Sequence, residues 1–158
     1  MDSRVSLLYS DAKIAIGAYE NVHLVCYRQS LDLDMLRRDR AAHDALAKRY
    51  PQGFGLVCTS QPNLSLPTQE VRRESAYMLQ ANRGRVLAAA VVVGGDGFWA
   101  SAARSVITGI NLVATPPYPI KIFDEVMPAS GWLAPQVPNL PGGSFALTTA
   151  IRELSEAR

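Results

Sequence analysis

The chain has 158 residues, of which 48% are hydrophobic and 19% are charged, so it is long enough for one domain with a single core. Its 16 basic and 14 acidic residues leave a net charge of +2, which is too small to favour nucleic acid as a partner. The longest apolar run, Val86 to Val93, is far shorter than the roughly 18–20 residues that a membrane span requires.

The N-terminus and the cysteines favour a cytoplasmic location. Residues 1–4 do not open the basic and then apolar pattern of a secretory signal. Cys26 and Cys58 lie in apolar runs, which is typical of buried, reduced thiols. Because the two cysteines and two histidines, His23 and His43, have unrelated spacings, we expect no metal site and no cofactor.

The hydrophobic pattern predicts alternating strands and helices over most of the chain. Short runs rich in β-branched residues indicate strands, and apolar residues recurring at three- and four-residue steps indicate helices. Ser30 or Asp32 is expected to cap the first helix, and Asp124 the fourth. The expected elements are, in chain order, a leader (1–11), a hairpin (13–20 and 22–28), a helix to about residue 49, a strand (54–59), a loop (61–67), a helix from residue 68 to before residue 84, a strand (85–93), a helix (98–113), a strand (118–123), a helix (124–133), a Pro/Gly linker (135–143) and a tail helix (144–158).

This order predicts an α/β domain over residues 12–134. The hairpin begins a central sheet, and right-handed βα crossovers make the rest of that sheet mostly parallel, with flanking helices. The run from Val86 to Val93 lacks alternation, as expected for a central strand that is covered on both faces. The tail helix (144–158) either packs on the domain, contacts a partner or frays.

Besides the opening hairpin, three segments give the chain a recognisable layout. They are Arg49-Tyr50-Pro51-Gln52-Gly53-Phe54, Ala102 to Gly109, and Pro117 to Asp124 leading to Gly131-Trp132-Leu133. Over about residues 12–134 this layout resembles the STAS superfamily, and most of all the stand-alone SpoIIAA-like bacterial proteins of the STAS/SEC14 type. The resemblance implies a SpoIIAA-like STAS fold. None of these segments is a catalytic signature, so the resemblance supports the fold rather than an activity.

In the antagonist branch of that superfamily, a kinase phosphorylates a Ser or Thr at the start of the second helix. Thr68 matches that hydroxyl position, and Ser65 is the other hydroxyl nearby. Leu66 lies near the position of the family's Asp, and Gln69 replaces its Gly. A phosphate would add about −1.5 to −2 charges where backbone N–H groups receive it. The alternative is that Thr68 only caps the helix.

Our first interpretation is therefore a non-enzymatic regulatory or protein-interaction domain. It docks a protein partner through the start of the second helix, with Ser65 and Thr68, and through the neighbouring loop (61–67) and third helix. A pull-down from native lysate that recovers no partner, together with turnover of some metabolite by the protein, would contradict this interpretation.

The alternative is a small-molecule or lipid-binding protein with an apolar pocket between helices. STAS folds resemble SEC14-type lipid carriers in layout, and here the third helix is very apolar and begins with Phe98 and Trp99. Arg104, inside that helix, either forms a local salt bridge or points into a ligand cleft. A third interpretation is a homo-oligomer, such as a homodimer, that buries an apolar patch of Tyr118, Trp132 and the tail helix.

Overall fold

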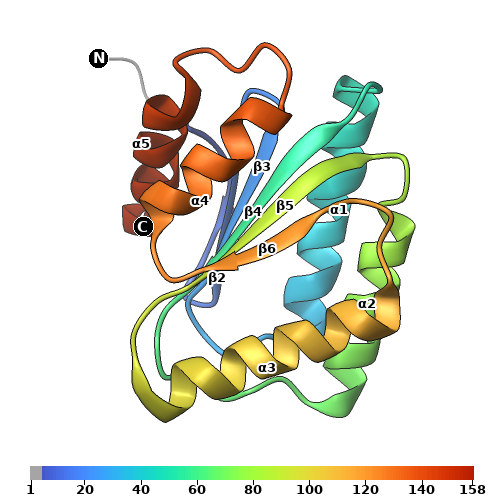
Figure 1. Cartoon of the computed structure of the whole chain (residues 1–158), viewed down its shortest axis with the longest axis vertical. Helices are drawn as coiled ribbons and strands as arrows, with labels where there is room; N and C mark the ends of the chain where they lie inside the picture. The colour runs from blue at the N-terminus through green and yellow to red at the C-terminus, as the bar shows by residue number, and fades with distance from the viewer. Residues whose placement is uncertain (1–4) are drawn as a thin grey trace.

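The computed structural model describes residues 5–158 and shows an α/β fold in three layers (Figure 1). One six-stranded sheet is the middle layer, with its strands side by side in chain order. Helices α1, α2 and α3 cover one face of the sheet, and α4 and α5 cover the other. The elements are β1 (Ser6–Ser10), β2 (Ile14–Tyr19), β3 (Val22–Tyr27), α1 (Leu33–Arg49), β4 (Phe54–Ser60), α2 (Gln69–Ala81), β5 (Val86–Val93), α3 (Gly97–Ala114), β6 (Ile120–Phe123), α4 (Val126–Leu133), the short 3₁₀ helix η1 (Ala134–Gln136) and α5 (Gly143–Glu156).

The predicted mostly parallel sheet that begins with a hairpin is confirmed. β2 and β3 pair antiparallel, while β3, β4, β5 and β6 pair parallel. Asp32 is the N-cap of α1, where its carboxylate accepts a hydrogen bond from the Met35 N–H at 2.8 Å. The cap of α4 is Glu125 rather than Asp124, and it makes no capping hydrogen bond through its side chain.

The expected leader (1–11) contains β1, which pairs antiparallel with β2 at the edge of the sheet. Its consecutive leucines, Leu7 and Leu8, are 48% and 52% exposed, so no alternation of buried and exposed residues marks the strand in the sequence. Residues 1–4 of that leader lie outside the described residues.

The expected tail helix (144–158) is part of the core, and the expected linker (135–143) contributes the buried Val137 to it. The inner face of α5 is at most 2% exposed and packs on β2, β3 and α4. The Tyr19 hydroxyl donates to the carbonyl of Pro141 at 2.5 Å, which ties the irregular segment to the sheet. Of the three roles considered for this helix, packing on the domain is therefore the observed one.

The structure contradicts one residue of the patch proposed for a homo-oligomer contact. Tyr118 is 8% exposed, and its hydroxyl donates to the carbonyl of Leu79 at 2.9 Å. Trp132 is half-buried and packs against the ring of Phe123, with ring centroids 5.7 Å apart. Oligomerisation itself stays a prediction.

The two faces of the sheet differ in how completely they are packed. Against α4 and α5, the core residues Ala15, Leu24 and Val57 are at most 1% exposed. Against α2 and α3, Cys58 and Val91 keep part of their surface accessible although both lie on inner strands of the sheet. Space therefore remains on this second face.

Candidate functional site

An apolar cavity of about 200 Å³ lies between the sheet and helices α2 and α3. Its floor comes from β3 to β6, and its roof from one side of α2 and of α3. Within residues 5–158, none of the side chains that line it is charged. The main apolar contributors are Leu56, Cys58, Val91, Ile120, Met78, Leu79, Trp99, Ala103, Val106, Ile107 and Ile110.

Small residues on facing elements leave this space open. Ala89 of β5 and Ala103 of α3 both line the cavity, so neither the floor nor the roof fills it there with a long side chain. The stripe of α3 that faces the cavity includes Trp99, Val106 and Ile110, which recur at helical spacing. This is the apolar stripe that periodicity predicts for the third helix.

The rim of the cavity is polar and uncharged, and it lies where β3 and β4 end. Gln29 follows β3, Ser60 closes β4, and Ser65 belongs to the exposed loop that follows. Ligands in open α/β sheets bind outside the carboxyl ends of the strands, which is where this rim lies. The indole N–H of Trp99 donates to the carbonyl of Leu64 at 2.7 Å and joins α3 to the loop.

Ser65 and Trp99, both predicted as site residues, lie on the cavity wall. Thr68 does not line it: its hydroxyl oxygen accepts from the Val71 N–H at 3.3 Å and caps α2. Phe98 does not line it either and is 90% exposed. Of the two adjacent helical residues Phe98 and Trp99, only Trp99 faces the cavity, and the role of Phe98 as a ligand or partner contact stays a prediction.

Arg104 contacts backbone carbonyls of the described chain, and its role as a ligand or partner contact stays a prediction. Its guanidinium donates to the carbonyls of Val93 at 3.1 Å and Gly95 at 3.4 Å. These contacts fasten α3 to the end of β5 outside the cavity, and no carboxylate partner is found for Arg104 among the described residues.

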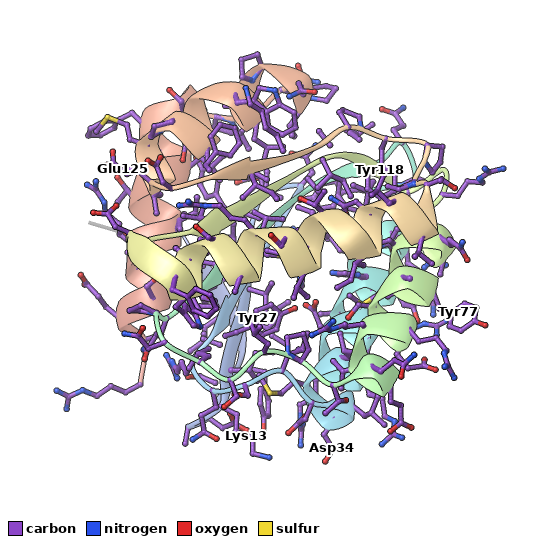
Figure 2. The ribbon with its side chains drawn as sticks, turned by 60° about the horizontal axis from the view of Figure 1, so that its bottom comes forward. Lys13, Tyr27, Asp34, Tyr77, Tyr118 and Glu125 are labelled. Carbon is purple, nitrogen blue, oxygen red and sulfur yellow. The ribbon has the colours of Figure 1, made fainter. Side chains whose placement is uncertain are left out.

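A buried polar cluster lies next to the cavity, and sequence reasoning missed its central residue. Asp39 of α1 is fully buried, and its Oδ1 lies 2.6 Å from Nε2 of His23. The hydroxyl of Tyr27, a residue that lines the cavity, donates to Oδ2 of Asp39 at 3.2 Å. Figure 2, in which α3 crosses the front of the molecule, shows Tyr27 close to this helix.

The signal for Asp39 is present in the sequence but subtle. Met35, Asp39, His43 and Leu46 are spaced along one side of α1, and all four are buried. An aspartate in the apolar stripe of a helix requires a buried hydrogen-bonding partner. His23 supplies it from 16 residues earlier, a distance at which no local motif forms.

Burial and mutual contact set the charges of this cluster. Burial alone would raise the pKa of Asp39, but His43, His23 and the hydrogen bonds it accepts outweigh that effect and hold the pKa below its usual value. Burial lowers the pKa of His43 to about 4, with Asp39 opposing the shift. At neutral pH Asp39 is therefore ionised and His43 is neutral, with the Asn82 side-chain nitrogen 3.2 Å from its Nδ1.

Tyr27 and Cys58 keep their protons at neutral pH. Burial, and then the Asp39 carboxylate, raise the pKa of Tyr27 well above its usual value. The same two causes raise the pKa of the Cys58 thiol, so this residue serves as an apolar part of the wall rather than as a thiolate.

His23, Asp39 and His43 also offer the donor types of a metal site. One ligating atom from each lies within 4.8 Å of the others. A tetrahedral zinc ion with ligands at about 2.0–2.1 Å would separate each pair of ligand atoms by roughly 3.3 Å. The 2.6 Å between His23 and Asp39 is instead the length of a charge-assisted hydrogen bond, so a hydrogen-bonded network describes the cluster better.

No family model, curated protein or solved structure matches this chain. Its fold and site define an α/β protein with a mostly parallel sheet and an apolar cavity between that sheet and two helices. The resemblance to the STAS superfamily stays a prediction. Within residues 5–158, no helix combines the length and hydropathy that crossing a bilayer requires.

Proposed function

We propose that this protein binds an apolar small molecule in the cavity between the sheet and helices α2 and α3. The observation that supports this proposal best is a cavity of about 200 Å³ whose lining, among the described residues, is uncharged. A dry apolar cavity of about 150 Å³ is large enough to bind benzene. The ligand, or the part of it that enters, is therefore about the size of one ring or a short alkyl chain.

The apolar wall supports an occupant. The cavity is partly open to solvent, and Cys58 and Val91 on its wall stay partly accessible. Covering apolar surface of this kind contributes about 25 cal/mol per Å².

The proposed role is binding without chemical conversion. The Cys58 thiol keeps its proton because burial raises its pKa, which removes the strongest nucleophile on the wall. The hydroxyl of Tyr27 donates to the Asp39 carboxylate and stays protonated at neutral pH because its pKa is raised, so it does not act as a general base.

Docking of a protein partner through Ser65 and Thr68, the first interpretation from the sequence, stays a prediction. Thr68 already uses its hydroxyl oxygen to cap α2, which agrees with the simpler alternative for that residue. The exposed Ser65 lies on the rim of the cavity, where either a partner or an entering ligand would contact it.

Binding is tested with toluene as the probe and with two matched variants. Ala103→Phe places a ring in the cavity, whereas Ala102→Phe adds the same ring one residue earlier, on a residue that does not line it. We expect toluene to raise the melting temperature of the wild type and of Ala102→Phe but not of Ala103→Phe. Native mass spectrometry of the freshly purified protein should also show retained ligand mass. A melting temperature that toluene leaves unchanged in the wild type, with no retained mass, would overturn the proposal.

A further inference from the structure

We infer that the ligand is a neutral apolar molecule with one hydrogen-bond donor, such as an alcohol, whose hydroxyl donates to the phenolic oxygen of Tyr27. This inference rests on the proposed function and adds the chemical class of the ligand. It follows from the hydrogen bonds that polar groups of the cavity wall already donate within the protein.

Most hydroxyl and indole protons of the wall are engaged within the protein. A hydroxyl that donates inside the fold keeps its lone pairs for a ligand, and an indole that donates keeps nothing. The bonds run from Tyr27 to Oδ2 of Asp39, from Thr59 to the Val25 carbonyl, from Ser60 to the Gln61 carbonyl, from Ser75 to the Val71 carbonyl and from Trp99 to the Leu64 carbonyl. The four hydroxyls can therefore accept from a ligand but do not donate to it, and Trp99 does neither.

Tyr27 differs from the other wall hydroxyls because a buried charge lies behind it. Asp39 is fully buried and ionised at neutral pH, and its Oδ2 accepts a hydrogen bond from the Tyr27 hydroxyl at 3.2 Å. A hydroxyl that donates to an anion carries more negative charge on its oxygen and becomes a better acceptor. The strongest acceptor on the wall is thus the phenolic oxygen of Tyr27.

The same arrangement disfavours an anionic ligand. A carboxylate inside the cavity would find no cationic side chain among the described lining residues and would face the Asp39 charge through Tyr27. The neutral amides of Gln29 and Asn111 also line the cavity, but neither supplies a countercharge. An ether or ketone oxygen would meet lone pairs at Tyr27, so a donor is the group that fits.

Probes that differ only in their polar group test this inference. Benzyl alcohol, benzyl methyl ether, benzoate and toluene are titrated calorimetrically into the wild type, Tyr27→Phe and the control Tyr19→Phe, which removes a tyrosine hydroxyl that donates to Pro141 away from the cavity. One net hydrogen bond of about 0.5–1.5 kcal/mol corresponds to a roughly 2- to 13-fold preference for the alcohol over the ether. We expect that preference in the wild type and in Tyr19→Phe, its loss in Tyr27→Phe, and weakest binding for benzoate.

The outcomes separate this inference from the proposed function. If toluene binds no variant, the proposed function fails. If toluene binds but the alcohol and the ether bind the wild type equally, or benzoate binds best, the anchoring role of Tyr27 is overturned. Should Tyr27→Phe not fold, intermolecular NOEs in the wild type decide. Contacts from the benzyl methylene to the Tyr27 ring support the inference, and contacts to Asn111 without any to Tyr27 overturn it.

Discussion

Ala103→Leu is expected to stabilise the protein, although enlarging a buried residue ordinarily does the opposite. Ala103 is 8% exposed on α3 and lines the cavity, so a leucine here extends into open space. Its three added carbons contribute about 0.8 kcal/mol each when buried, and fixing the side chain costs about 0.5–1 kcal/mol. Because alanine and leucine have similar helix propensities, a net gain of about 1–2 kcal/mol follows.

The assay is urea unfolding followed by far-UV circular dichroism, on protein refolded after organic extraction so that no retained ligand competes with the new side chain. Ala100→Leu is the matched control, because Ala100 lies on the same helix, is 0% exposed and does not line the cavity. Overpacking there should cost about 1–3 kcal/mol. A loss of stability in Ala103→Leu equal to that of the control would show that the layer is already filled and would refute the reasoning.

Three further changes probe the rest of the structure. His43 has a pKa of about 4 in the folded protein and a usual value of 6.5. Between these two pH values the unfolded chain binds more protons than the folded one. The free energy of unfolding should therefore fall by about 3 kcal/mol as the pH drops from 6.5 to 4. His43→Gln should flatten this dependence in urea titrations at each pH. Thr68→Ala removes the cap of α2 and should cost about 1 kcal/mol, whereas Thr68→Ser should cost less, as thermal unfolding would report. Gly55→Ala brings a Cβ within 2.7 Å of Cγ2 of Val137 and should lower stability by about 1–3 kcal/mol in the same measurement, with partial recovery when Val137→Ala is added.

The parts of the fold that local chemistry specifies could be predicted from the sequence. The run from Val86 to Val93 has the unbroken apolar character of a doubly covered strand, and it is β5. Asp32 has the capping position and side chain that begin α1. The prolines of residues 135–143 indicate irregular backbone, and most of that segment is irregular. Irregular backbone does not by itself mark the end of the domain, because Val137 in that segment is 3% exposed.

Only the part of the cavity wall that lies on the single helix α3 could be predicted from the sequence. Periodicity places Trp99, Val106 and Ile110 on one side of α3, and the structure places them on the cavity wall. The same periodicity leaves the adjacent Phe98 off this side, and Phe98 is 90% exposed. The cavity itself depends on the distance between two layers, and no residue pattern within one segment encodes that distance.

Tyr27 links a buried charge to the cavity wall. Asp39 is fully buried, and its pKa lies below the usual value, so the folded protein stabilises its charged form at neutral pH. Asp39 accepts the hydrogen bond of the Tyr27 hydroxyl, and Tyr27 forms part of the cavity wall. The charge therefore fixes the direction of one polar group on a largely apolar wall, and the proposed ligand would meet that group there.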